Sequence, residues 1–183
     1  MRISQTLQFV LFFGLVGGSW AAAEQPGLTV GEKAPDFTLE SSTGAEMKLS
    51  EIRGDGPVIL VFVRSADWCP HCRRQLQNLE ANQTALEAGG AQLVAVSYDK
   101  VATQAQAVAK LGLTYPLLAD PGSKTIEAYG ILNHEARGKG LGVPHPAIFI
   151  IDGGGTIRAK LMEESYRDRP SSEAIQAALE ALN

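Results

Sequence analysis

A run of six apolar residues, Val58 to Val63 (VILVFV), limits the folds open to this chain more than any other segment. Its length suits a strand, most of its residues are β-branched, and no polar residue interrupts it. Such a strand is buried on both faces, which requires a layer of structure on each side of its sheet. The run therefore predicts an α/β domain in which helices cover both faces of a central sheet.

The rest of the chain supplies the other strands and the covering helices. Further apolar runs and a hairpin with a Gly153–Gly155 turn predict strands, and segments with helical spacing that stop at glycine predict helices. Ser171 or Ser172 is the expected cap of the last helix. The order of these segments predicts a mixed sheet. We expect strands at 36–40, 46–49, 58–63, 92–98, 147–152 and 156–161, and helices at 70–88, 101–111, 123–129 and 171–182.

The first 23 residues have the layout of a secretory signal peptide. Arg2 supplies a positive start, Phe9 to Val16 an apolar run, and Ala21 to Ala23 the small residues before a cleavage point. The apolar run is shorter than the roughly 20 residues of a membrane-spanning helix, which makes an uncleaved anchor the weaker alternative. We expect 1–23 to be removed and 24–183 to form one periplasmic or secreted domain.

The charge of that domain argues against nucleic acid as a partner. Removing residues 1–23 takes one arginine and no acid from the 16 basic and 20 acidic side chains, which leaves a net charge of −5. No segment concentrates lysine and arginine into a basic stripe of the kind that follows a phosphate backbone.

The chain has only two cysteines, Cys69 and Cys72, and they stand directly after the buried strand at the start of a predicted helix. Positions i and i+3 of a helix lie about 5 to 6 Å apart at Cβ, so a small adjustment brings the two sulfurs to bonding distance. Unpaired N–H groups at a helix start stabilise an anion. We therefore expect a redox centre in which Cys69 is the attacking thiol with the lower pKa.

The two residues between the cysteines are expected to tune this centre. Pro70 suits the first helical turn, where its missing N–H costs nothing. His71 adds partial positive charge near neutral pH, which stabilises a thiolate and makes the disulfide more oxidising. A zinc half-site is the competing interpretation. Zinc would need four ligands, and the only soft ligands besides the two cysteines are His71, His134 and His145.

The residues around the cysteines resemble a known family. Residues 66–72 (ADWCPHC) resemble the active-site loop of thioredoxin-like proteins, and residues 31–39 (GEKAPDFTL) resemble the opening of the redoxin and peroxiredoxin (AhpC/TSA) branch. Residues 115–121 (YPLLADP) are similar to a peroxiredoxin segment, and residues 143–152 (VPHPAIFIID) resemble the family's cis-proline loop and the strand after it. The resemblance covers most of the domain and implies a thioredoxin-like fold that needs no organic cofactor.

The same resemblance implies the walls of a substrate groove. Pro146 is the expected cis residue that faces the cysteines, and Trp68 and His145 flank the groove beside it. The glycine-rich segment 138–142 precedes this loop, and we expect it to form a rim of the groove. His145 with both thiols also suggests a copper site as a third possibility, although copper-chaperone relatives space their cysteines differently.

Peroxiredoxin chemistry is the main alternative, but its motif is incomplete. Peroxiredoxins carry Pro-x-x-x-Thr-x-x-Cys and a distant arginine that together bind the peroxide. Counted back from Cys72, the proline and threonine positions hold Ser65 and Cys69, and counting from Cys69 does not restore the motif. Pro146 stands where the arginine is expected. These departures favour thiol-disulfide exchange, with a thiol-peroxidase antioxidant as the alternative.

One departure from thioredoxins concerns the proton of Cys72. The buried acid six residues before the first cysteine corresponds to Val63, and Glu80, Asp99 and water are the candidates to replace it. The direction of electron flow stays open. We expect protein thiols or disulfides as substrates, and a redox partner that regenerates the pair, with a membrane-bound protein as one candidate.

Overall fold

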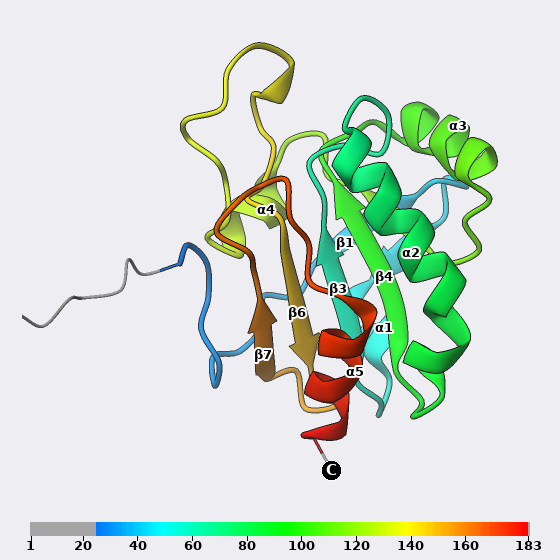
Figure 1. Cartoon of the computed structure of the whole chain (residues 1–183), viewed down its shortest axis with the longest axis vertical. Coiled ribbons are helices and arrows are strands. Elements are labelled where there is room, and N and C mark those ends of the chain that lie inside the picture. Colours follow the sequence, from blue (N-terminus) through cyan, green and yellow to red (C-terminus); the bar gives the residue numbers. More distant parts are fainter. Residues whose placement is uncertain (1–24, 183) are drawn as a thin grey trace, which may run out of the picture.

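The computed structural model describes residues 25–182, so the expected signal peptide 1–23 lies outside the described residues. In the part described, seven strands form one mixed sheet in the order β2-β1-β5-β4-β3-β6-β7 (Figure 1). The strands are β1 (Thr38–Ser41), β2 (Glu46–Lys48), β3 (Val58–Phe62), β4 (Gln92–Ser97), β5 (Leu117–Ala119), β6 (Ala147–Ile151) and β7 (Ile157–Leu161). The helices are α1 (Leu49–Arg53), α2 (Pro70–Glu87), α3 (Val101–Leu111), α4 (Lys124–Ala128) and α5 (Ser172–Glu180), with a 3₁₀ turn at Gly138–Gly140.

Strand β3 is the centre of the sheet and is buried on both faces. It pairs parallel with β4 and antiparallel with β6, and all five of its residues have no exposed surface. This confirms the prediction from its uninterrupted apolar sequence. The adjacent β4 and β6 are buried for the same reason, because their apolar runs also lie between two helical layers.

Two apolar cores lie on opposite faces of the sheet. On one face α2, α3 and α5 pack against alternate residues of the strands, with Leu76 and Leu79 of α2 almost fully buried. On the other face α1 and α4 contribute Leu49 and Ile126 to a core around Phe62. Helices therefore cover both faces, as expected, and the fold is thioredoxin-like.

Two short elements do not follow from the sequence pattern. Helix α1 has five residues, and β5 has three within the segment that resembles peroxiredoxins. Elements this short show no measurable period, since one helical turn or one strand pair is all they contain. β5 nevertheless joins the antiparallel β1–β2 pair to the parallel strands, because it pairs with both β1 and β4.

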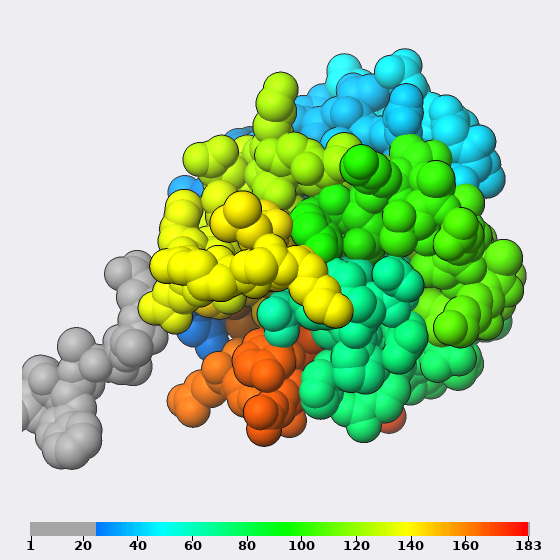
Figure 2. Space-filling model, turned by 90° about the horizontal axis from the view of Figure 1, so that it is seen from above, coloured from blue at the N-terminus to red at the C-terminus, as the bar shows by residue number. Residues whose placement is uncertain are grey.

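The strand register brings three loops together at one end of the sheet. Phe62, the last residue of β3, pairs with Ala147 at the start of β6 and with Val96 of β4. The loop after β3, the loop after β4 and the loop before β6 therefore meet there. Figure 2 looks onto this end and shows residues near 70 (teal), 140 (yellow) and 165 (orange) side by side. Within residues 25–182, no helix is both long and apolar enough to cross a membrane.

Candidate active site

The two cysteines form a disulfide at the start of α2, on the end of the sheet where the loops meet. Cys69 is the N-cap of α2, Pro70 follows in its first turn, and the Sγ of Cys69 accepts a hydrogen bond from the N–H of Cys72 at 3.3 Å. The Cα atoms are 5.3 Å apart, within the usual range for a disulfide. An otherwise unpaired helical N–H is thus directed at the first sulfur, the arrangement expected from the sequence.

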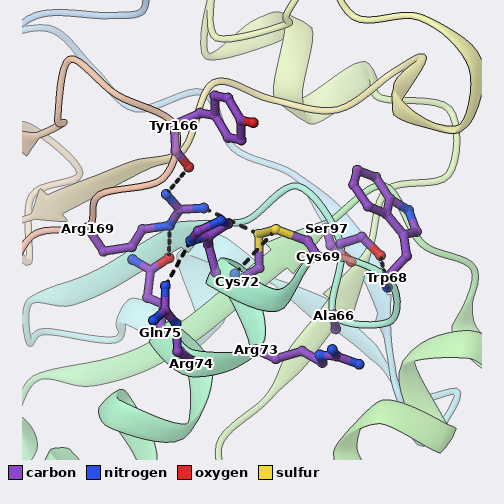
Figure 3. Close-up of a disulfide and its surroundings, with 12 residues drawn as sticks. Ala66, Trp68, Cys69, Cys72, Arg73, Arg74, Gln75, Ser97, Tyr166 and Arg169 are labelled. Carbon is purple, nitrogen blue, oxygen red and sulfur yellow. Dashed lines mark hydrogen bonds between the residues drawn. A yellow bond between two sulfur atoms is a disulfide. The ribbon is translucent and has the colours of Figure 1, made fainter.

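The group in contact with the second sulfur is an arginine that the sequence analysis missed. Nη2 of Arg169 lies 3.4 Å from Sγ of Cys72, and its Nε donates to Oε1 of Gln75 at 2.8 Å (Figure 3). Burial, with the nearby charges of Arg64 and Arg74, lowers the pKa of Arg169 to about 10. The guanidinium is therefore still charged at neutral pH. Its contact with Cys72 spans 97 residues, which no local sequence signal predicts.

Neither carboxylate considered for the proton of Cys72 contacts a sulfur. Glu80 accepts hydrogen bonds from the backbone N–H and the hydroxyl of Thr114, at 2.7 and 2.8 Å. Asp99 is buried and accepts hydrogen bonds from Ser65 Oγ at 2.9 Å and from the N–H of Ala66 at 2.8 Å. Asp99 therefore holds the loop that leads to Cys69, which is a structural task next to the site.

The imidazole of His71 is hydrogen-bonded to an arginine of the same helix. Its Nδ1 lies 2.8 Å from Nη2 of Arg74. Because a guanidinium only donates, we assign Nδ1 as the acceptor and place the ring hydrogen on Nε2. The positive group that touches a sulfur is thus Arg169, and the tuning role of His71 stays a prediction.

Trp68 connects the cysteine loop to the glycine-rich loop. Its Nε1 donates to Oη of Tyr98 at 2.9 Å, and that hydroxyl donates to the carbonyl of Lys139 at 2.5 Å. The guanidinium carbon of Arg64 lies 5.3 Å from the centre of the Trp68 ring and 4.7 Å from that of Tyr166, so cation–π contacts continue across the site. The segment 138–142 is thereby joined to the site through Tyr98.

The loop before β6 lies at the same end of the sheet as the loop that carries the cysteines, but its proline is not cis. Between residues 25 and 182 no peptide bond is cis, so the cis assignment of Pro146 was wrong. The segment runs extended: Pro144 forms an antiparallel bridge with Leu132, and the N–H of His145 donates to the carbonyl of Ile131 at 2.7 Å. An extended segment that continues directly into a strand accommodates the trans bond, which is also the lower-energy form.

The geometry does not assemble the metal sites considered from the sequence. Within the described residues, no three side chains of the types His, Cys, Asp and Glu stand close enough together to hold a metal ion. Burial lowers the pKa of His145, opposed by Glu135 and assisted by His134 and Arg64. The imidazole is thus neutral at neutral pH and half-buried beside the site.

Comparisons with known proteins agree with this geometry. The family model described as the AhpC/TSA family matches residues 30–160. The thiol-disulfide oxidoreductase ResA of Geobacillus thermodenitrificans is 29% identical over 136 residues, which cover 74% of this chain and 70% of that protein. Alkyl hydroperoxide reductase E of Mycobacterium bovis is 31% identical over 139 residues, which cover 75% of this chain and 87% of the relative.

A solved structure supports the same relationship. The crystal structure of peroxidoxin BcpB from Mycobacterium tuberculosis superimposes with a TM-score of 0.75 and 26% identity, over 84% of this chain and 97% of the other. The family match covers most of the sequence, and the close cysteine pair fits the redox chemistry of such proteins. The chain is thus an oxidoreductase with a thioredoxin-like fold, and it belongs to the AhpC/TSA family.

Proposed function

We propose that the protein is a thiol-disulfide oxidoreductase that works by dithiol–disulfide exchange through Cys69 and Cys72. The observation that carries the proposal is the isolated pair at the N-terminus of α2, where a helical N–H is directed at Cys69 and a guanidinium touches Cys72. Both groups favour thiolates, the reactive form in exchange.

The exchange proceeds in two steps. A substrate thiolate attacks Sγ of Cys69, the Cys69–Cys72 bond breaks, and Cys72 leaves as a thiolate beside Arg169. A second substrate thiolate then attacks the substrate sulfur of the mixed disulfide and releases Cys69. Two substrate thiols become one disulfide, and the protein gains two electrons. In the reverse direction Cys69 attacks a substrate disulfide and Cys72 resolves the intermediate, with Trp68 and the Pro146 loop flanking the substrate.

Peroxide reduction is the second candidate, because relatives of the chain include an alkyl hydroperoxide reductase. The residues of this chain support it less well. Ser65 and Cys69 occupy the proline and threonine positions counted back from Cys72, and Pro146 replaces the peroxide-binding arginine. Copper binding, the third candidate, has the least support, because within residues 25–182 His145 forms no metal-binding group with the two cysteines.

The compartment and the partners belong to the same proposal. Removal of residues 1–23 would leave the domain 24–183 in the periplasm or outside the cell, where disulfides persist. Protein thiols or disulfides would be its substrates, and a second redox protein, with a membrane-bound one as a candidate, would regenerate the pair. The ResA relative, whose name describes thiol-disulfide oxidoreduction, supports this choice of chemistry.

Serine variants of the two cysteines test the proposal. With a disulfide-containing protein as substrate, Cys69→Ser should abolish exchange, whereas Cys72→Ser should accumulate a mixed disulfide that non-reducing electrophoresis and mass spectrometry detect. Wild-type protein should consume peroxide no faster than a free thiol, and the reduced protein should lose copper(I) to a chelator. Fast, Cys-dependent peroxide consumption without exchange would replace the proposal with the peroxidase.

A further inference from the structure

The disulfide of this acidic protein lies among arginines that form no salt bridge with the described residues. The chain has 20 acidic and 16 basic side chains. Within residues 25–182 the two salt bridges join Lys48 to Asp36 and Arg158 to Asp152, away from the cysteines. The arginines around the disulfide and on the adjoining start of α2 take part in neither salt bridge, although Asp168 acts on Arg167 and Arg169. The arginines of this group are Arg64, Arg73, Arg74, Arg167 and Arg169.

Three of these arginines line one open cleft beside the disulfide. The cleft has a volume of about 390 Å³ and lies between the start of α2 and the segment before α5. Arg74, Arg167 and Arg169 form its cationic walls, and Asn78 and Ser171 add neutral polar groups. Asp168 is the single carboxylate that lines it, so the cleft is positive even with its own acid included.

One side chain, Arg169, both lines the cleft and contacts a sulfur of the disulfide. Arg169 lines it and also stands 3.4 Å from Sγ of Cys72, and His71, between the two cysteines, lines it as well. Guanidinium groups bind carboxylates through paired hydrogen bonds. Arg169 is already engaged by Gln75, two backbone carbonyls and Cys72. The side chains of Arg74 and Arg167 each have one hydrogen bond within residues 25–182, to His71 and to Tyr166, so their other N–H groups are open to a ligand.

We propose that this cleft selects anionic thiols and disulfides by binding a carboxylate next to the reacting sulfur. The inference rests on the proposed exchange reaction and adds its substrate class. The carboxylate belongs either to a small thiol acid or to an acidic residue beside a cysteine of a protein. In both cases its charge would lie within reach of Arg74, Arg167 and Arg169 while the sulfur attacks the pair.

The rate of reduction of the oxidised protein by thiols of different charge tests this inference. The probes are 3-mercaptopropionate and 2-mercaptoethanol, each normalised to its rate with the neutral bis(2-hydroxyethyl) disulfide. A second pair consists of cysteinyl peptides with Glu or Gln beside the cysteine. The normalised rate should favour the anionic member by about tenfold at low salt, as expected for a cleft of one charge sign. Salt at about 0.5 M should erase most of the preference, because it shortens the Debye length.

Charge-reversal variants locate the effect. Arg74→Glu combined with Arg167→Glu should remove the preference. The control is Arg158→Glu, which should keep the preference. Arg158 lies at the opposite end of the sheet, because β7 begins beside Ile151, which pairs with Val58 at the start of β3. If both probe pairs show the preference, a negative charge beside the sulfur is sufficient for selection, and a small thiol acid can be a substrate. If only the peptides show it, the substrate is a protein with an acidic residue beside its cysteine.

The failures of the two proposals are distinguishable. Equal normalised rates for anionic and neutral thiols, or an equal loss of preference in Arg158→Glu, would overturn the anionic cleft and leave the exchange reaction intact. If no thiol of any charge reduces the Cys69–Cys72 pair, the exchange reaction itself is wrong and the inference falls with it.

Discussion

Cys72 has a cation, Arg169, in contact with its sulfur, and it lacks the buried acid that the resemblance to thioredoxins implies. That acid would stand six residues before Cys69 and accept the proton of the second thiol, but the position holds the apolar Val63. A charged guanidinium stabilises the thiolate instead, through a hydrogen bond to an ionised group. Since the thiolate belongs to the reduced state, this contact favours reduction of the pair and makes the disulfide a stronger oxidant.

Replacing Arg169 by glutamine should therefore make the reduction potential of the pair more negative. A hydrogen bond to a charged group is worth about 1.5 to 3 kcal/mol, which corresponds to roughly 30 to 60 mV for two electrons. The potential is measured by equilibration in glutathione buffers, with tryptophan fluorescence as the readout. Arg158→Gln removes an equal charge far from the sulfurs and should leave the potential in place. An unchanged potential in Arg169→Gln would show that the contact does not stabilise the thiolate.

At this scale the sequence predicts what is local. The spacing of Cys69 and Cys72, the place of Pro70 in the first turn and the helical N–H at Cys69 all follow from a helix that starts after a strand. The contact of Arg169 depends on the complete fold, because it joins the last loop to the first turn of α2. The sequence could not show either whether the bond before Pro146 is cis or trans, because the two forms of an X-Pro bond differ in free energy by only about 0.5 to 1 kcal/mol.

Among the elements, the loops around the disulfide are joined by a small number of side-chain hydrogen bonds. Tyr98, which follows β4, receives a hydrogen bond from Trp68 of the cysteine loop and donates one to Lys139 in the glycine-rich segment. Gly142 in that segment has a positive φ of 92°, and a Cβ there would meet Ser123 Oγ at 2.8 Å. The segment thus depends on glycine for its path, and two side chains attach it: Tyr98 through Lys139, and Ser123, whose Oγ donates to the carbonyl of Gly142 at 2.7 Å.

Tyr98→Phe should loosen the glycine-rich segment without unfolding the domain. The variant loses both hydrogen bonds of the hydroxyl, and the one to Lys139 holds the segment. That bond is worth about 1 kcal/mol, so local amide exchange in residues 138–142 should accelerate roughly fivefold. Hydrogen exchange with mass spectrometry measures it. Tyr115→Phe is the matched control, because that buried hydroxyl also donates to a carbonyl, that of Leu76, on a different element. If both variants accelerate exchange in the segment equally, the attachment through Tyr98 is not specific.

The elements themselves were predictable where their apolar pattern is long. The runs that form β3, β4 and β6 have five or six residues, and the periodicity in α2 extends over several turns. α1 and β5 are too short for a period to be read, and so are α4 and β2, which were predicted from the glycine and turn residues beside them. Their conformations are fixed by what they pair with, β5 by β1 and β4, and that pairing is information about the whole chain.

For the whole molecule, the protonation of the half-buried His145 beside the site links the stability of the fold to pH. His145 precedes β6 at the end of the sheet where the loops meet, and burial lowers its pKa below the ordinary value of 6.5. The unfolded chain thus takes up a proton at a higher pH than the folded protein does. The stability that depends on a neutral His145 is therefore present at neutral pH and declines as the pH falls through about 6.5.

The free energy of unfolding should accordingly be lower at about pH 5 than at about pH 7.5, and His145→Gln should reduce that difference. Urea unfolding of the oxidised protein at both pH values measures it. Asp152 titrates in a different window: the hydrogen bond from the Thr156 amide lowers its pKa below 3.8, so its contribution is lost only in stronger acid. Above about pH 7.5 the free energies of unfolding of wild type and variant should change with pH in the same way, because His145 is neutral there in both the folded and the unfolded chain. If the variant keeps the full wild-type decrease between the two pH values, other groups cause the acid sensitivity and the buried histidine does not.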